Sequence, residues 1–175
     1  EHADNIAPAI FGGFTLVKSV APLEILELPT PKDLFAVIIH PQIEIKTSES
    51  RAILPKKIDL QDAITQWSNV GSLVHALHTS DYELLSRSLT DVAVEPHRSK
   101  LIPHFDTVRQ AAIQNGALGC GISGSGPSIF SLCFGNESAQ KVAKAIKDVY
   151  SETEISFHVY VSEINTEGIK ILSTK

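Results

Sequence analysis

The sequence predicts an α+β fold in which an antiparallel sheet carries helices on one face. From Leu34 onward, apolar runs of strand length and amphipathic helical patterns follow one another in the order β, several α, β, β, α, β. That order is the split βαβ, or ferredoxin-like, arrangement. Two further short strands precede Pro29 and have no place in this plan, so we expect them to form a different sheet.

The first part of the chain divides at a short, stiff connector, Pro29-Thr30-Pro31. We therefore predict two domains, residues 1–31 and residues 32–175. Pro8–Gly13 is expected to form a turn that ends in glycine, and Thr47–Leu54 a short helix that the next proline ends. Three apolar stretches are predicted as strands: Phe14–Ser19, Leu23–Leu28 and Leu34–Ile39.

The rest of the chain alternates between helical and strand patterns. Four helices are predicted, from Asp59 as a cap, from a capping box at Ser80–Glu83 through Leu89, over Phe105–Asn115, and from Asn136 as a cap. The first of them has apolar residues at helical spacing: Leu60, Ile64, Trp67, Val70 and Val74. Two closing strands are predicted at the end: Ile155–Ile164 and Gly168–Leu172.

Composition limits the function classes. The 175 residues are 43% hydrophobic and 20% charged, as in soluble globular proteins, and the net charge of −5 gives no general attraction to nucleic acid. No apolar run approaches membrane-spanning length. Cys120 and Cys133 would not face each other across a hairpin, so we expect no disulfide and a reducing compartment, the cytoplasm. The chain has no methionine, and its first residues resemble an interior segment of a longer protein.

A glycine-rich stretch runs from Gly116 to Leu132. Part of it matches G-x-G-x-x-G, but that motif needs a helix to follow, and here Pro127 and an apolar strand follow instead. The segment therefore predicts a hairpin with positive φ at Gly124 and Gly126. One interpretation is a purely structural turn, which composition alone favours. The other is a turn whose amides and hydroxyls approach a ligand.

Polar residues that a bare fold does not require occur at a few other places. Thr47 and Arg51 are four apart and share one face of a predicted helix, while Arg98 lies on a segment bounded by prolines. His2 and Asp4 can point at one ligand if they belong to an interior loop. Guanidinium groups bind carboxylate or phosphate through paired hydrogen bonds, and an aspartate suits an ammonium or hydroxyl group. The residues alone indicate an anion-binding α+β domain, suited to an amino acid or another small carboxylate.

The sequence predicts no metal site. His75 and His78 are three apart on a predicted helix, but no third ligand has suggestive spacing.

Several of these segments resemble a known family. The stretch from His2 to Phe14, HADNIAPAIFGGF, resembles the central motif of the homoserine kinases. GCGISGSGPS, from Gly119 to Ser128, resembles the third motif of the GHMP kinases, the superfamily that includes galactokinase and the homoserine and mevalonate kinases. His40-Pro41, the segment from Thr47 to Arg51, and EPHR ending at Arg98 fit the homoserine kinase pattern. The resemblance covers essentially the whole chain.

The resemblance implies that this is a C-terminal half, because family members are about twice as long. The missing N-terminal half would carry the nucleotide loop and the magnesium ligands, and the two early strands would complete its sheet. The intact enzyme would use ATP and Mg²⁺ to phosphorylate the hydroxyl of L-homoserine, a step toward threonine. The chain alone is expected to bind neither cofactor and to be inactive. A homodimer is compatible with the sequence, which leaves the oligomeric state open.

The resemblance also implies roles for single residues. His2 and Asp4 correspond to residues at the amino and hydroxyl end of homoserine, Arg51 and Arg98 to carboxylate-binding arginines, and Thr47 to a residue close to the reacting hydroxyl. The hairpin would support the phosphate region through Gly121, Ser123, Gly124, Ser125 and Gly126.

Two alternatives remain open at this point. One is a non-catalytic ferredoxin-like module that binds an amino acid, for which the HADN segment at the first residues would be unnecessary. The other is a different GHMP kinase, such as one acting on mevalonate, which is also a carboxylate. Asp4 as an ammonium partner favours an amino acid.

Overall fold

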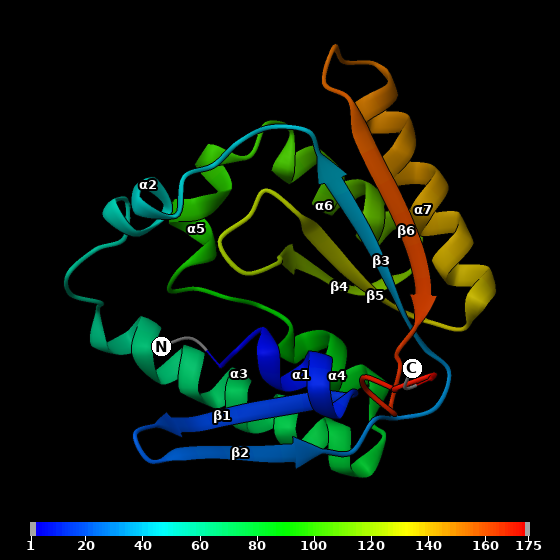
Figure 1. Cartoon of the computed structure of the whole chain (residues 1–175). Helices are drawn as coiled ribbons and strands as arrows, with labels where there is room; N and C mark the ends of the chain where they lie inside the picture. Colours follow the sequence, from blue (N-terminus) through cyan, green and yellow to red (C-terminus); the bar gives the residue numbers. More distant parts are fainter. Residues whose placement is uncertain (1–2, 174–175) are drawn as a thin grey trace.

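A computed structural model describes residues 3–173 (Figure 1). His2, one of the predicted substrate-binding residues, lies outside this range. The described chain forms these elements in order: α1 (Ile6–Phe11), β1 (Phe14–Val20), β2 (Leu23–Leu28), β3 (Leu34–Pro41), α2 (Thr47–Ala52), α3 (Leu60–Thr79), α4 (Tyr82–Ser88), α5 (Glu95–Arg98), a 3₁₀ turn (Ser99–Leu101), α6 (Phe105–Gln114), β4 (Ala117–Ile122), β5 (Ile129–Phe134), α7 (Asn136–Ser151) and β6 (Phe157–Glu163).

The strands form two separate sheets. The larger one is antiparallel and has the order β4-β5-β3-β6, while β1 and β2 pair only with each other. Helices α2 to α6 lie between β3 and β4 in the chain, and α7 lies between β5 and β6. This confirms the predicted split βαβ order and the prediction that the two early strands belong to a different sheet.

The central strand β3 divides the hydrophobic core in two, because its side chains alternate between the sheet faces. Val37 and Ile39 are buried in a cluster with residues of α6 and α7, such as Val108 and Ile146. Leu34 belongs to a second cluster with residues of α3 and α4. Helices α6 and α7 therefore cover one face of the sheet, and α3 and α4 pack against side chains of the opposite face, so the prediction of helices on one face holds for α6 and α7 and not for α3 and α4.

Helix α3 begins as the sequence predicts, since the Asp59 side chain accepts a hydrogen bond of 2.8 Å from the backbone N–H of Gln61. Its apolar pattern, however, lies largely on the exposed side. Leu60 and Trp67 are 68% and 67% exposed, whereas Ala63 and Leu77 are buried against the core.

Two predicted caps are wrong by one residue. Ser80 has φ 54° and ends α3, and Asp81 caps α4 through a 2.9 Å hydrogen bond from the N–H of Leu84. Gly135, with φ 77°, precedes α7, and the Asn136 side chain makes no capping bond. In both places a neighbouring residue suits the position better than the predicted cap. At α4, the aspartate carboxylate accepts hydrogen bonds strongly, and at α7, glycine adopts positive φ without strain.

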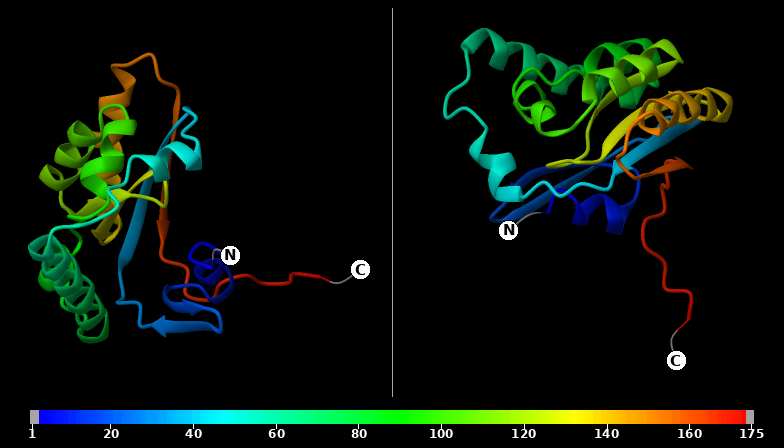
Figure 2. Two further views of the ribbon diagram at one scale, coloured as in Figure 1. Left: turned by 90° about the vertical axis from the view of Figure 1, so that its left-hand side faces the viewer. Right: turned by 90° about the horizontal axis from the view of Figure 1, so that it is seen from above.

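Two other predictions are corrected. Pro8 lies within helix α1 and not in a turn. Pro96 lies in the first turn of α5, where a missing N–H costs nothing. Gly168–Leu172 is not a strand, because its backbone meets α1 instead of a strand, as in the contact of Ile169 N with Ile10 O. Figure 2 shows this C-terminal segment running away from the body.

The two cysteines are free and buried, as predicted. Burial raises the pKa of both thiols, Cys120 and Cys133, to about 11. Neither is therefore a reactive thiolate near neutral pH.

No helix within residues 3–173 is long and apolar enough to cross a membrane.

Candidate functional site

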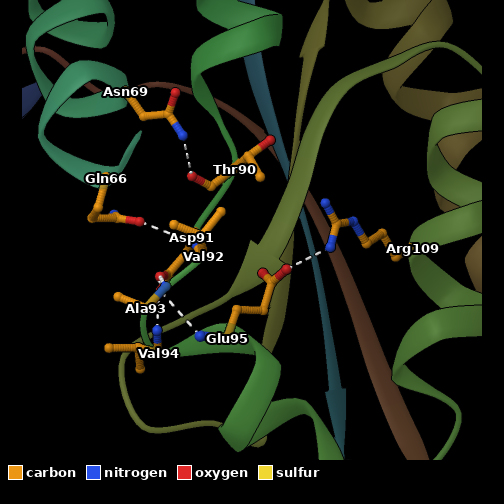
Figure 3. Close-up of polar contacts among 9 residues, drawn as sticks. All are labelled: Gln66, Asn69, Thr90, Asp91, Val92, Ala93, Val94, Glu95 and Arg109. Carbon is orange, nitrogen blue, oxygen red and sulfur yellow. Dashed lines mark hydrogen bonds and ion pairs between the residues drawn. The ribbon is translucent and has the colours of Figure 1, made fainter. Parts of the chain in front are cut away.

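Helix α3 fixes the segment that leads to Arg98 (Figure 3). Asn69 donates its side-chain N–H to the carbonyl of Thr90 at 2.8 Å, and Gln66 accepts from the N–H of Val92 at 2.9 Å. The two side chains lie three residues apart on α3, so one helix face holds two successive peptide groups of the segment.

Asp91 folds the same segment into the start of α5. Its carboxylate accepts hydrogen bonds from the backbone N–H groups of Ala93 and Val94, both at 2.8 Å, and from that of Glu95 at 3.2 Å. The first two amides belong to the turn that leads into α5, and the third is the first N–H of the helix, which has no partner within it. Asp91 thus sets where α5 begins and, three residues after Glu95, where Arg98 lies.

Arg98 joins three elements that are far apart in sequence. Its Nε donates to the carbonyl of Ser50 on α2 at 3.2 Å, and its Nη1 donates to the carbonyl of Gly124 in the hairpin at 3.0 Å. Ser50 is fully buried and donates its hydroxyl to the carbonyl of Ser125 at 3.1 Å. These bonds use two of the five guanidinium N–H groups of Arg98, so donors remain for an anion.

The glycine-rich hairpin has the predicted backbone. Gly124 and Gly126 have φ values of +59° and +82°, and the Ser123 N–H closes the turn on the carbonyl of Ser128 at 2.8 Å. The hydroxyl of Ser128 also lies 2.8 Å from Nδ1 of His40 at the end of β3. The turn is therefore anchored to β3, α2 and α5, and its tip holds a defined position beside Arg98.

Glu95 and Arg109 form an ion pair next to Gly121 of β4. Nη1 of Arg109 on α6 lies 2.6 Å from Oε1 of Glu95, whose side chain is 8% exposed (Figure 3). Burial raises the pKa of Glu95 above its usual 4.5, while Arg109 and a hydrogen bond with the backbone of Ile122 act in the opposite direction. A Cβ at Gly121 would lie 3.0 Å from Oε2 of Glu95, so a small residue is needed there.

A pocket of about 390 Å³ opens between α3, the segment before Arg98, and β4. Both apolar and polar side chains line it. Arg98, Gly121 and Gly124 are the predicted site residues that line it, together with residues such as Asn69, Leu73, Leu89 and Phe130. The pocket therefore places the guanidinium of Arg98 beside an apolar space and a glycine-rich backbone.

The structure brings some predicted site residues together and leaves others apart. Thr47 is the first residue of α2 and Arg51 lies in its last turn, so both are carried by the helix that also presents the Ser50 carbonyl to Arg98. Asp4 is exposed in the turn before α1, and within residues 3–173 no hydrogen bond links it to Arg98. The two arginine segments and the hairpin thus form one cluster.

Four residues that support this cluster could not be singled out from the sequence. Gln66, Asn69, Asp91 and Arg109 have no role in the sequence-based prediction, although Asp91 has a detectable signal, because aspartate commonly accepts hydrogen bonds from backbone N–H groups two and three residues later in a turn. The Glu95–Arg109 pair had no such signal, because its members lie fourteen residues apart on different elements.

No group of three or more His, Cys, Asp or Glu side chains within the described range is arranged to hold a metal ion.

The chain is similar in sequence to proteins of known function. Residues 73–152 match the family model described as GHMP kinases C terminal. The chain is 47% identical over 173 residues to a homoserine kinase from Chlorobium phaeobacteroides (strain DSM 266), which is 98% of this chain and 54% of that protein. It is 45% identical over 175 residues to a homoserine kinase from Chlorobaculum tepidum, again 54% of that protein. The chain thus spans about half the length of the curated relatives that it matches.

Solved structures agree with this similarity. The crystal structure of homoserine kinase from Cytophaga hutchinsonii superimposes with a TM-score of 0.93 and 52% identity, over 95% of this chain and 53% of that one. A mevalonate kinase from L. major, in complex with R-mevalonate, has a TM-score of 0.61 at 15% identity, over 81% of this chain and 46% of that one, which shows a shared fold.

Proposed function

We propose that this chain, whose residues 73–152 match the model described as GHMP kinases C terminal, is the C-terminal half of an enzyme that transfers the γ-phosphate of ATP to the hydroxyl of L-homoserine. The hydroxyl oxygen forms the new bond to phosphorus, ADP leaves, and the hydroxyl proton is released. This is a step toward threonine, and the enzyme would work in the cytoplasm. In this proposal, residues 1–31 complete the N-terminal domain and residues 32–175 form the C-terminal one.

The observation that carries the proposal is the cluster around Arg98. Its guanidinium is held by the carbonyls of Ser50 and Gly124 and still has donors for a carboxylate. Arg51 would bind the same carboxylate from α2. Thr47, at the start of that helix, would lie close to the reacting hydroxyl, and His2 and Asp4 would approach from the N-terminal segment toward the amino and hydroxyl end of the substrate.

The hairpin would act on the phosphate side of the site. Its glycines allow a close approach of the backbone, and the amides and hydroxyls from Ser123 to Gly126 can donate to phosphate oxygens. Phosphoryl transfer depends mainly on positioning and charge stabilisation, so this chain need not supply a dedicated base. The residues that hold magnesium would belong to the other half of the enzyme.

Kinetics of Arg51→Ala and Arg98→Ala in the complete enzyme test the carboxylate assignment. A hydrogen bond to a charged group contributes about 1.5–3 kcal/mol, so each variant should lose roughly one to two orders of magnitude in kcat/KM for homoserine, with a much smaller change in the KM for ATP. Arg98→Lys should recover little of the loss, because an ammonium group cannot form the paired bonds.

A decarboxylated substrate, 3-aminopropan-1-ol, is the matched control. It should be equally poor with the wild type and both variants, because the arginines would have no carboxylate to bind. If the analogue still distinguished the variants from the wild type, or if ATP binding suffered most, these arginines would face the nucleotide phosphates instead. Turnover of mevalonate but not of homoserine by the wild type would reject the substrate itself.

A further inference from the structure

The chain segment that follows β6 packs against the C-terminal end of helix α1. The backbone N–H of Gly13 donates to the carbonyl of Asn165 at 2.7 Å, and the N–H of Ile169 donates to the carbonyl of Ile10 at 3.4 Å. The Ile10 carbonyl belongs to the last turn of α1, where the helix has no N–H of its own to offer it. Residues 165–169, which we call the C-terminal turn, therefore bind α1 from the opposite end of the chain, and Figure 1 shows this red segment beside α1.

The two segments meet at a pair of glycines that leave no room for a side chain. Gly12 and Gly168 have φ values of +78° and +63°. A Cβ at Gly12 would lie 2.5 Å from the backbone nitrogen of Gly168, and a Cβ at Gly168 would lie 2.7 Å from the carbonyl carbon of Ile10. A side chain at either position would therefore push the backbone of α1 and the C-terminal turn apart. We call this contact the Gly12–Gly168 crossing.

The C-terminal turn is closed by its own hydrogen bonds and is attached to the large sheet. The Asn165 side chain donates to the carbonyl of Gly168 at 3.2 Å and accepts from the N–H of Glu167 at 3.0 Å. Just before the turn, the N–H of Ile164 donates to the carbonyl of Leu34 on β3 at 3.1 Å. The turn therefore connects α1 to the sheet from which the glycine-rich hairpin extends.

Helix α1 carries one of the proposed substrate-binding residues. Asp4 lies in the turn before α1, and the N–H of Ala7 donates to the carbonyl of Ala3 at 2.8 Å, so that turn is continuous with the helix. Arg98 is bound to the hairpin of the large sheet through the carbonyl of Gly124. The placement of Asp4 relative to Arg98 is therefore set in part by the contact of α1 with the C-terminal turn.

We propose that the Gly12–Gly168 crossing positions the substrate site of the complete enzyme, by holding α1 so that Asp4 and Arg98 contact the same homoserine molecule. Gly12 and Gly168 are positioning residues in this role, since neither has a side chain that could touch the substrate. The role rests on the proposed function, which gives Asp4 and Arg98 a common ligand. A misplacement of about 1 Å can cost roughly a hundredfold in rate, so a displaced α1 should impair the reaction although no binding side chain is changed.

Steady-state kinetics of the complete enzyme compare Gly12→Ala with Gly135→Ala as a matched control. The two glycines have φ values of 78° and 77° and ψ values of −176° and 153°, so alanine strains both backbones, but a Cβ at Gly135 would meet nothing within 4 Å. We expect kcat/KM for homoserine to fall about tenfold to a hundredfold further in Gly12→Ala than in Gly135→Ala, with KM for ATP changed less than about twofold. Gly168→Ala should reproduce the loss. Adding it to Gly12→Ala should cost little more, because either change alone already separates the segments.

Hydrogen–deuterium exchange of the same variants measures the crossing without any substrate. Residues 3–13 should exchange faster in Gly12→Ala and in Gly168→Ala than in the wild type, because the N–H of Gly13 loses its partner. They should not exchange faster in Gly135→Ala, whose substitution lies before α7.

A wild type that does not phosphorylate homoserine would reject the proposed function and the positioning role with it. An active wild type whose Gly12→Ala and Gly168→Ala variants match Gly135→Ala would overturn the positioning role alone. Faster exchange with unchanged kcat/KM would also overturn it, since the crossing would then be purely structural. If the glycine variants do not fold, Asn165→Ala opens the C-terminal turn at an exposed side chain and leaves both glycines in place. It should lower kcat/KM for homoserine about threefold or more without changing KM for ATP, and wild-type kinetics in Asn165→Ala would overturn the role.

Discussion

Removing the Arg109 guanidinium should destabilise the fold through Glu95. The carboxylate is 8% exposed and its Oε1 lies 2.6 Å from Nη1 of Arg109, so Arg109→Met leaves a buried charge without its ionic partner. Breaking a fully buried pair costs about 3–5 kcal/mol. Arg109 itself is 36% exposed, so water can replace part of its effect, and we expect a loss of about 2–3 kcal/mol in the free energy of unfolding. Urea denaturation of the chain, followed by circular dichroism, measures it.

A double variant at Glu95 and Arg109 distinguishes the loss of their ion pair from the loss of packing by the Arg109 side chain. Glu95→Gln keeps a side-chain oxygen for the N–H of Ile122 but has no charge to bury. Glu95→Gln with Arg109→Met should therefore be more stable than Arg109→Met alone, by about 1 kcal/mol or more. If the double variant were as unstable as the sum of the two single ones, the methylenes of Arg109, and not its charge, would be responsible.

The pH dependence gives a second check. Burial raises the folded-state pKa of Glu95 above 4.5, so the folded state takes up this proton more readily than the unfolded state, and the contribution to stability falls as pH rises through that window. Without Arg109 the folded pKa rises further, since the guanidinium lowers it. Asp91 and Asp106, which face the same carboxyl, raise it in both proteins. The deficit of Arg109→Met should therefore be large at about pH 7 and shrink toward about pH 4, and a deficit that does not change with pH would refute the reasoning.

Two further predictions concern activity. The chain by itself should produce no ADP from ATP, magnesium and homoserine, because the proposed nucleotide loop and metal ligands belong to the preceding half; turnover by the pure chain would show that the site does not span two halves. In the complete enzyme, Gly126→Val should lower kcat more than Gly124→Val, because both positions have positive φ but a Cβ at Gly126 would also lie 3.0 Å from Cδ1 of Ile102, whereas one at Gly124 meets nothing within 4 Å. Equal, wild-type kinetics in both would make the hairpin purely structural.

Much of the fold could be predicted because its signals are local. The limits of β2 and the start of α3 follow from alternation, spacing and the Asp59 cap, all of which act within a few residues. The two wrong caps were decided by the neighbouring residue, whereas the wrong strand was decided by contacts distant in sequence. Gly168–Leu172 has the composition of a strand, yet no strand lies beside it, and the bond from Ile169 goes to α1.

The candidate site also combines features with a local sequence signal and features that depend on contacts distant in sequence. The hairpin and the isolated arginines could be singled out from the sequence, because positive φ and guanidinium chemistry are properties of single residues. The partners of Arg98 could not, since Ser50 and Gly124 lie 48 and 26 residues away and offer only backbone carbonyls, which every residue has. The exposure of Leu60, Ile64 and Trp67 on α3 could not be predicted either, because spacing defines an apolar stripe without stating what covers it.

The position of Arg98 therefore depends on a chain of contacts, each supplied by a different element. Asn69 and Gln66 on α3 hold the peptide groups of the segment, Asp91 turns it into α5, and Glu95 fixes that helix against Arg109. Arg98 then ties the carbonyl of Ser50 to that of Gly124. Because Arg98 binds both α2 and the hairpin, which also meet directly through the bond from the Ser50 hydroxyl to the Ser125 carbonyl, a ligand that binds Arg98 engages the proposed hydroxyl side and the proposed phosphate side of the site together. Arg98→Ala should for that reason impair catalysis more than Arg51→Ala, even where both lose one carboxylate contact.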